Sequence, residues 1–242
     1  MPSARPWRSA ARTDPGKVRA RNEDAFLDCP ERGLWVVADG MGGHHGGDRA
    51  SRLIVESIAA LPSDCGFEPR LQQLRQCLHW LNRRFGQELT VTADQPSRIM
   101  GSTVAALLLD GQRAACIWAG DSRCYLWRGG RLYQLTRDHS LQQHLIDEQG
   151  LSPEDARRHP SAHALTRAIG ASDDLTLDIL ELQVYPDDAF LLCSDGLYQY
   201  VSQEALGYAL SLASPTAALE RLFDHALLGM ARDNLTAVVI RR

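Results

Sequence analysis

Aspartate residues stand beside apolar, strand-like runs at four places in this chain. Asp39, Asp121 and Asp195 each follow such a run and precede a glycine or a serine, whereas Asp233 and Asn234 lead into one. Taken singly, each aspartate fits a turn former whose side chain hydrogen-bonds its own backbone. Taken together at one rim of packed strands, the carboxylates would repel one another unless divalent cations lay between them. Oxygen-only ligation favours magnesium or manganese over zinc or copper.

A glycine-rich segment, GMGGHHGG at residues 40–47, follows Asp39 directly. Glycines let the backbone approach an ion or a phosphate closely, and a glycine carbonyl such as that of Gly40 can itself be a ligand. The segment lacks the third glycine of a dinucleotide fingerprint and the Lys-Ser/Thr pair of an NTPase phosphate loop. His44 and His45 are poor zinc candidates, because adjacent histidines in a turn point apart.

Arg19 lies in a charged stretch at residues 19–24, close to the start of the chain. Its planar guanidinium suits phosphate oxygens. Read alone, the same stretch also fits a solvated surface turn. With carboxylates and metal ions nearby, the residues indicate hydrolysis of a phosphate ester by a metal-activated water.

The chain resembles the metal-dependent protein phosphatases of type 2C (the PPM family) in their compact bacterial form. The resemblance rests on these segments in this order: VRARNEDAF, VVADGMGGHHGG, GSTVAALLL, WAGDSRCYLWRGG, LTRDHS, LTRAIG, LLCSDGLYQYV and ARDNLTAVVI. It runs from about residue 13 to residue 240. It implies an α+β fold, a four-layer α-β-β-α sandwich of two mostly antiparallel sheets flanked by helix pairs, with residues 1–242 forming a single catalytic domain.

The resemblance also implies a centre of two manganese or magnesium ions. Asp39 would bridge them, and Asp195 and Asp233 would complete the first site. The Gly40 carbonyl would bind the second ion, with Glu23 acting directly or through water.

Further roles follow from the same resemblance. Asp121, together with Asp195, matches the place of a third ion, and Arg19 matches the phosphate-binding arginine. Asp24 and Asn234 would orient the ligands.

The proton donor to the leaving group is not assigned by the resemblance. Eukaryotic relatives have a histidine directly after the Asp-Gly pair, where this chain has Met41. His44 lies three residues further on and is a candidate general acid. A water held by a metal ion would serve equally.

The elements that must position these residues follow from hydrophobic periodicity. Strand-like runs cover residues 24–28, 34–38, 103–109, 114–119, 124–127, 131–135, 175–182, 189–193 and 235–240. Helical runs cover residues 48–61, 69–89, 140–149, 203–212 and 216–230. Because the strands cluster with helix pairs between them, two antiparallel sheets are favoured over a doubly wound parallel sheet. Residues 142–167 occupy the place of the family's flap, and they fit either a mobile lid or an inert connection.

Composition narrows the class of protein. The 242 residues are 44% hydrophobic and 23% charged with a formal net charge of -4, which is ordinary globular usage and disfavours a nucleic-acid-binding surface. No apolar run approaches the ~20 residues of a membrane span, and the first residues lack a signal-peptide core. The six cysteines form no Cys-x-x-Cys pair and fit reduced thiols. A cytoplasmic protein, monomeric in the absence of a heptad pattern, is expected.

The sequence therefore predicts a serine/threonine phosphatase acting on phosphoserine and phosphothreonine proteins, with a cognate Ser/Thr kinase as the expected partner. Two alternatives remain open. One is a phosphoesterase for small molecules, and the other is a catalytically inactive module that binds phosphoproteins. The complete set of aspartates argues against the inactive module, because such a protein would be free to lose ligands.

Overall fold

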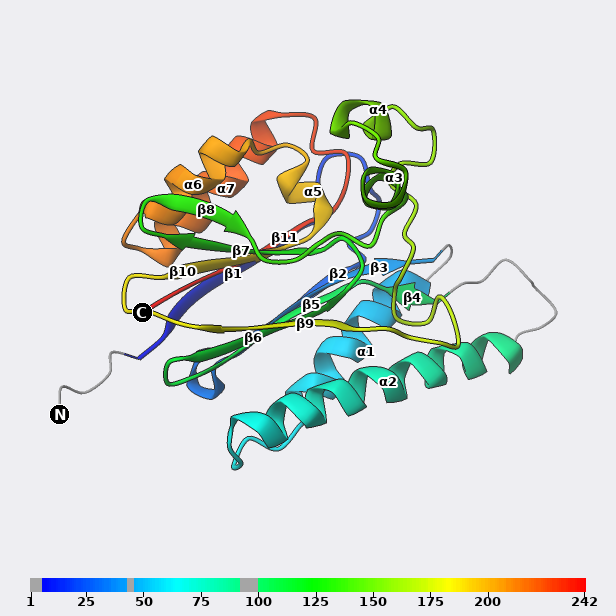
Figure 1. Ribbon diagram of the computed structural model, residues 1–242, viewed down its shortest axis with the longest axis horizontal. Coiled ribbons are helices and arrows are strands. Elements are labelled where there is room, and N and C mark those ends of the chain that lie inside the picture. The colour runs from blue at the N-terminus through cyan, green and yellow to red at the C-terminus, as the bar shows by residue number, and fades with distance from the viewer. Residues whose placement is uncertain (1–5, 43–45, 92–99) are drawn as a thin grey trace.

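The computed structural model describes residues 6–42, 46–91 and 100–242. In these ranges two antiparallel sheets pack face to face, with helices on both outer faces (Figure 1). The first sheet has the strand order β1 (Arg8–Asp14), β11 (Leu235–Arg241), β10 (Ala189–Cys193), β7 (Arg123–Arg128) and β8 (Arg131–Gln134). The second has the order β2 (Asp24–Cys29), β3 (Leu34–Met41), β5 (Val104–Asp110), β6 (Arg113–Ala119) and β9 (Asp178–Gln183), and β4 (Gly101–Ser102) pairs with β3. This is the α-β-β-α sandwich predicted from the sequence.

Helix pairs cover the sheets. Helices α1 (Gly46–Ala59) and α2 (Phe67–Val91) pack on the second sheet, and α6 (Gln203–Ser211) and α7 (Pro215–Leu228) pack on the first (Figure 1). Alternation along β3 divides its side chains between two apolar layers. Val36 faces the helices and Trp35 faces the opposite sheet, and both are fully buried.

Short elements complete the described chain. Helices α3 (Leu141–Gln149) and α4 (Pro153–Arg157) form an excursion from the sandwich, α5 (Asp195–Tyr198) follows β10, and a single 3-10 turn, Pro30–Arg32, joins β2 to β3. The Ser140 side chain caps α3 by accepting a hydrogen bond from the Gln143 N–H, which satisfies one of the free donors of the first turn.

The structure contains β4 and α5, which the sequence-based prediction lacks, and it differs from that prediction at three further places. Strand β1 was not predicted, because RSAARTD has no clear apolar alternation; its position is fixed by pairing with β11. Strand β9 begins at Asp178 rather than at residue 175. Strand β3 continues through Asp39 and Gly40 to Met41, because the Gly40-Met41 end pairs with β4. Asp39 therefore lies within a strand, not in the turn after it.

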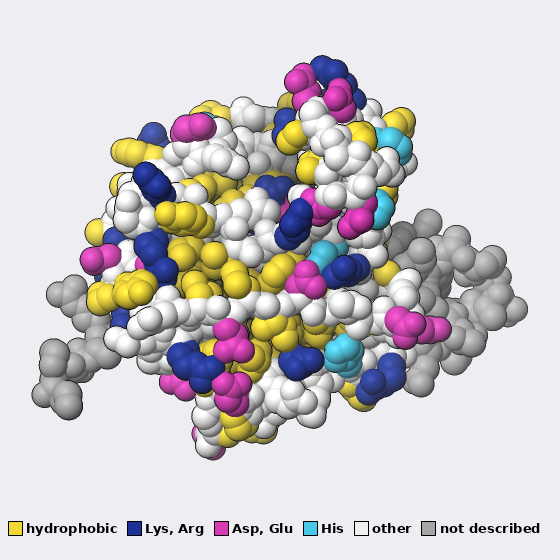
Figure 2. Space-filling view, viewed as in Figure 1, with side chains coloured by type: hydrophobic (Ala, Val, Ile, Leu, Met, Phe, Trp, Pro, Cys, Tyr) yellow, Lys and Arg dark blue, Asp and Glu magenta, His cyan; other side chains and the backbone are white. Residues whose placement is uncertain are grey.

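The exposed surface mixes charges of both signs. On the face drawn in Figure 2, Lys and Arg side chains lie close to Asp and Glu side chains. In the described ranges, no helix is long and apolar enough to cross a membrane.

Candidate metal centre

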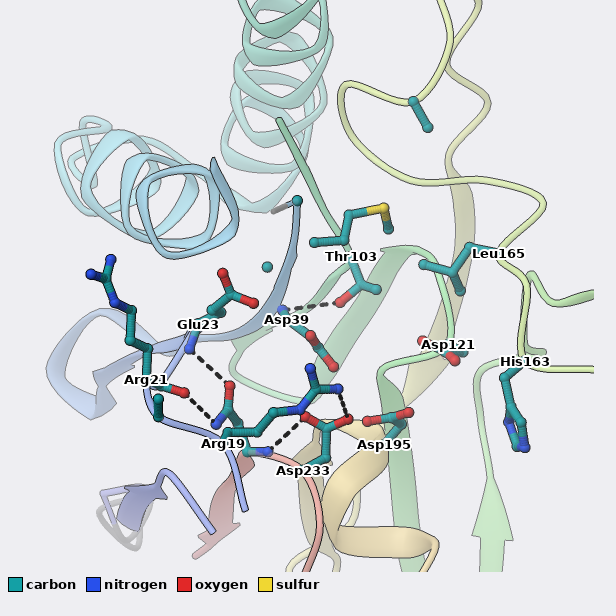
Figure 3. A pocket seen from close by; sticks show the side chains of 16 residues that line it. Arg19, Arg21, Glu23, Asp39, Thr103, Asp121, His163, Leu165, Asp195 and Asp233 are labelled. Atoms are coloured by element: carbon teal, nitrogen blue, oxygen red, sulfur yellow. Dashed lines mark hydrogen bonds and ion pairs between the residues drawn. The ribbon is translucent and has the colours of Figure 1, made fainter. Parts of the chain in front are cut away.

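A pocket of about 820 Å³ opens at one edge of the sandwich. Eight of the residues singled out from the sequence line it: Arg19, Glu23, Asp39, Gly40, Asp121, Asp195, Asp233 and Asn234. They come from both sheets and from the loops that join their strands. In Figure 3 the Asp39, Asp195 and Asp233 side chains lie around the Arg19 guanidinium, with Glu23 on one side and Asp121 and His163 on the other.

Asp39 and Gly40, at the end of β3, are held in place by hydrogen bonds to their backbone atoms. The Asp39 N–H donates to the Thr103 hydroxyl at 3.1 Å, and its carbonyl accepts from the Thr103 N–H at 2.9 Å. The Gly40 N–H donates to the Glu23 carbonyl at 3.1 Å. A Cβ on Gly40 would collide with the Gly47 carbonyl at the start of α1, so only glycine fits between strand and helix.

Asn234 fastens the loop that carries Arg19 and Glu23. Its amide nitrogen donates to the carbonyls of Pro15 and Arg21 at 3.0 and 2.9 Å, and its amide oxygen accepts from the Glu23 N–H at 2.9 Å. Asn234 thereby fixes the backbone of this loop, whereas its role in orienting metal ligands stays a prediction.

Arg19 lies against Asp233. Its guanidinium donates to Asp233 Oδ2 at 2.7 Å, and this hydrogen bond raises the pKa of Arg19. The other carboxylate oxygen of Asp233 accepts from the Asn234 N–H at 2.9 Å. The arginine lines the pocket and its side chain is half exposed.

Asp195 and Asp121 are joined through the short helix α5. Asp195 is the first residue of α5, and its side chain accepts from Gln199 at 2.7 Å. The Tyr198 hydroxyl on the same helix donates to the Asp121 carbonyl at 3.1 Å. This bond links the two segments that were predicted to share a third ion.

Asp24 lies beneath the pocket rather than on its wall. Its side chain is buried, and Oδ2 accepts from the Ser194 hydroxyl at 2.7 Å. Its Oδ1 is among the few buried side-chain atoms of the described residues that have no hydrogen-bond partner. Burial raises the pKa of Asp24 to about 7.

The pocket carboxylates raise one another's pKa. Burial raises the pKa of Asp39 well above its usual range, and the charges of Asp24, Asp195, Asp121 and Asp233 raise it further. Burial, followed by the Asp195 charge, raises the pKa of Asp121 to about 8. Burial and the Asp233 charge raise that of Asp195. Such a cluster is stabilised by positive charge, so its donors fit hard divalent cations.

The donors do not form a closed cage. In the part of the chain that the structure describes, no three His, Cys, Asp or Glu side chains meet as a metal-holding group. Magnesium and similar ions commonly bind through one or two carboxylates and keep several waters. The open arrangement therefore suits ions whose remaining positions are taken by water and by a phosphate substrate.

His163 also lines the pocket, and the sequence analysis did not single it out. It is placed by two bonds at the base of the excursion, where the N–H groups of Leu141 and Gln142 donate to the carbonyls of Ala164 and Ala162. In the sequence His163 ends a polar stretch that contains two histidines, and nothing in that stretch indicates this pairing. His44 lies outside the described residues, whereas Met41 does line the pocket.

Nearly the whole chain is similar to known protein phosphatases. Residues 17–235 match the family model described as Protein phosphatase 2C. The serine/threonine protein phosphatase PstP of Mycobacterium tuberculosis is 38% identical over 233 residues, which are 96% of this chain but 44% of that protein. The chain thus spans less than half of that relative. The serine/threonine phosphatase Stp of Listeria welshimeri is 32% identical over 96% of this chain and 94% of its own.

Solved structures agree with the fold. PppA of Pseudomonas aeruginosa, described as a key regulatory component of T6SS, is 42% identical, covers 98% of each chain and gives a TM-score of 0.90. The PstP catalytic domain in complex with 2 manganese ions is 35% identical. The superposition covers 98% of this chain and 98% of that chain and has a TM-score of 0.86.

Proposed function

This chain belongs to the protein phosphatase 2C family, and from that membership we propose that it is a metal-dependent serine/threonine phosphoprotein phosphatase. The observation that carries the proposal is the pocket in which Asp39, Asp195 and Asp233 lie around the guanidinium of Arg19. The carboxylates supply the negative charge that cations need, and the arginine supplies a donor for a phosphate.

Two manganese or magnesium ions, when bound, would lower the pKa of a water for in-line attack at phosphorus. In the proposal Asp39, Asp195, Asp233 and the Gly40 carbonyl hold this pair, with Glu23 acting directly or through water. The manganese-bound PstP catalytic domain supports two ions of this kind. We extend the proposal to a third ion held by Asp121 and Asp195, whose segments are joined by the Tyr198 bond.

Arg19 orients the phosphate in this proposal. The guanidinium is anchored at one end by Asp233 and is half exposed to the pocket, so its free donors are available to non-bridging phosphate oxygens. A planar fork can hold two such oxygens at once, and it can offset the charge that develops in the transition state.

The leaving alkoxide must be protonated. The thioether of Met41 has no proton to donate. Among the described residues that line the pocket, His163 is the histidine on the wall. His44 stays a candidate from the sequence, so His163→Gln and His44→Gln are to be compared on substrates with good and poor leaving groups. The variant that loses activity only on the poor leaving group identifies the acid.

The same proposal assigns residues 1–242 to one catalytic domain and residues 142–167 to a flap beside the pocket. Relatives named as serine/threonine phosphatases support phosphoserine and phosphothreonine proteins as substrates. We add a cognate Ser/Thr kinase as the opposing partner, with the phosphatase acting as a monomer.

Turnover of a phosphothreonine peptide with manganese, with chelator and after manganese is restored tests the proposal. Reversible loss and recovery is expected. Full activity in chelator would contradict the metal-dependent mechanism. Hydrolysis of small phosphomonoesters without peptide turnover would favour the small-molecule phosphoesterase, and peptide binding without any turnover would favour the inactive module.

A further inference from the structure

Large apolar side chains are exposed in the two segments that lead to Arg19 and Asp233. Val18, Leu228 and Met230 are 66%, 87% and 58% exposed. The other strongly exposed large hydrophobic residues described are aromatic: Trp80, Tyr133, Tyr185 and Tyr208. Arginines lie over three of those rings, those of Trp80, Tyr185 and Tyr208. Val18, Leu228 and Met230 are aliphatic, with no polar group to face water, and they are called the apolar rim below.

The two segments that carry the apolar rim are bonded to each other. The Lys17 N–H donates to the Ala231 carbonyl at 2.8 Å, and the Lys17 ammonium donates to the Gly229 carbonyl at 2.9 Å. Val18 follows Lys17 directly, and Leu228 and Met230 flank Gly229. Figure 1 shows this loop and the chain after α7 side by side at the end of the sandwich that also carries α3 and α4.

The rim is held in a fixed shape. Ala231 is buried and has a φ of 38°, an unusual value for a residue other than glycine. The Tyr200 hydroxyl accepts from the Arg232 N–H at 3.3 Å on the other side of this bend. Gly16 packs so closely on the carbonyls of Ala231 and Asp233 that a Cβ there would collide with both. Leu228 and Met230 lie just before this bend, on either side of Gly229, and both are exposed.

The apolar rim is continuous with the proposed phosphate site. Val18 precedes Arg19, and Met230 lies three residues before Asp233, the partner of Arg19 at 2.7 Å. An extended chain advances about 3.3–3.6 Å per residue. Residues next to a phosphorylated residue held at Arg19 are therefore within reach of the rim. The exposed Lys17 and Arg232 at the same place are compatible with a phosphorylated, negatively charged segment.

We propose that the apolar rim is a docking surface for an extended segment of the phosphoprotein substrate that carries a large aliphatic or aromatic side chain within a few residues of the phosphorylated residue. This inference rests on the proposed phosphatase function and adds a sequence preference to it. Val18, Leu228 and Met230 bury the apolar side chain, and Arg19 holds the phosphate.

Two phosphothreonine peptides that differ only in having leucine or alanine beside the phosphorylated residue test this directly. The wild type is expected to have a kcat/KM about 5- to 20-fold higher for the leucine peptide, the effect of partly burying one such side chain. The double variant Leu228→Ser/Met230→Ser should lose this preference through a higher KM. Its turnover of p-nitrophenyl phosphate and of the alanine peptide should stay at the wild-type level.

Tyr133→Ser, at an exposed residue on β8, is the matched control and should keep the preference. Equal rates for the two peptides in the wild type would overturn the inference and leave the proposed function intact. No turnover of either peptide would overturn both. A concentration-dependent dimer that is lost in the double variant would show that a second copy of this chain covers the rim, and would also overturn the inference.

Discussion

Arg19 can be changed with little disturbance of the fold, because its side chain is half exposed and its hydrogen bond within the described chain goes to Asp233. Arg19→Lys keeps the charge but removes the planar fork. We expect kcat/KM to fall by about 10- to 100-fold on both a phosphothreonine peptide and p-nitrophenyl phosphate, the effect of one charge-assisted hydrogen bond.

Arg113→Lys is the control for this change. Arg113 is also exposed and pairs with two carboxylates, but it lies on β6 away from the pocket. It should keep wild-type kinetics. Wild-type kinetics in Arg19→Lys as well would mean that Arg19 is only a surface charge.

Asp39 is the carboxylate on which the charges of the pocket converge, since burial and four other aspartates raise its pKa. Asp39→Asn keeps the shape and removes one negative charge. We expect activity to fall by several orders of magnitude, while the chelator-treated variant melts above the chelator-treated wild type. A gain of 1 kcal/mol in unfolding free energy corresponds to about 2–4 °C for a chain of this size.

Calorimetry with and without manganese checks the Asp39→Asn prediction. A lower melting temperature in chelator, together with unchanged manganese binding, would contradict the assignment of Asp39 to the metal centre.

At the residue scale, the sequence predicted acidic side chains of the pocket wall better than the hydrogen bonds that place them. Asp121, Asp195 and Asp233 were singled out because acidic residues at the ends of apolar runs form a recognisable pattern, and all three line the pocket. His163 was missed, because its place in the pocket depends on bonds between residues 141–142 and 162–164. Hydrogen bonds between loops leave no periodic signal in the sequence.

At the scale of elements, the predicted helices and most strands match because their apolar periodicity is local. Strands β1 and β4 and helix α5 were not predicted. Strand β1 depends on pairing with β11, β4 has 2 residues, and α5 has 4 residues, too few for a helical period. The extension of β3 past Asp39 likewise depends on β4, which lies 60 residues further along the chain. The strands and strand ends that were not predicted depend on pairing with residues far away in the sequence.

His139 joins the base of the α3–α4 excursion to the loop before Asp121. Its Nδ1 accepts from the Gly120 N–H at 3.1 Å, its Nε2 lies 3.1 Å from Asp178, and its ring stacks on Trp118. Its backbone N–H donates to the Gly120 carbonyl at 2.9 Å, and its carbonyl accepts from the Thr166 N–H at 2.9 Å. Burial lowers the pKa of His139, so a neutral ring with the proton on Nε2 fits these contacts.

His139→Ala is expected to lower the unfolding free energy by about 2–3 kcal/mol, because it removes a buried ring and leaves the Gly120 N–H without its partner. It should also weaken binding of the proposed ion at Asp121 more than binding of the other two. Metal stoichiometry and thermal melting check this. His159→Ala, at an exposed histidine on the excursion, is the control. If both variants behave alike, His139 does not position the Asp121 loop.

At the scale of the whole molecule, the sandwich brings to one edge acidic residues that its sequence places far apart. Asp39 comes from the second sheet, Asp195 and Asp233 from the ends of adjacent strands in the first, and Asp121 from the crossing between the sheets. Folding therefore brings mutually repelling carboxylates together, and bound cations would reduce this repulsion. Stability and metal binding must be linked in this protein.

This linkage predicts how stability depends on pH without metal. The pKa values of Asp24 and Asp121 are raised from 3.8 to about 7 and about 8 in the folded chain. The folded state then holds protons that the unfolded state releases, so stability falls as pH rises from about 4 to about 8. Each pKa unit corresponds to about 1.4 kcal/mol. Because the two groups interact, we expect a decrease of a few kcal/mol, or roughly 5–10 °C in melting temperature.

Melting in chelator between pH 5 and pH 8.5, repeated with manganese, measures this dependence. Manganese binds the deprotonated carboxylates of the folded state, so it should stabilise more at pH 8 than at pH 5 and flatten or reverse the trend. Asp121→Asn carries no titrating group at that position and should show a shallower decrease in chelator. A melting temperature in chelator that rises steadily from pH 5 to pH 8 would mean that these carboxylates are already compensated within the folded chain. The repulsion among the pocket carboxylates, which supports a metal centre here, would then be absent.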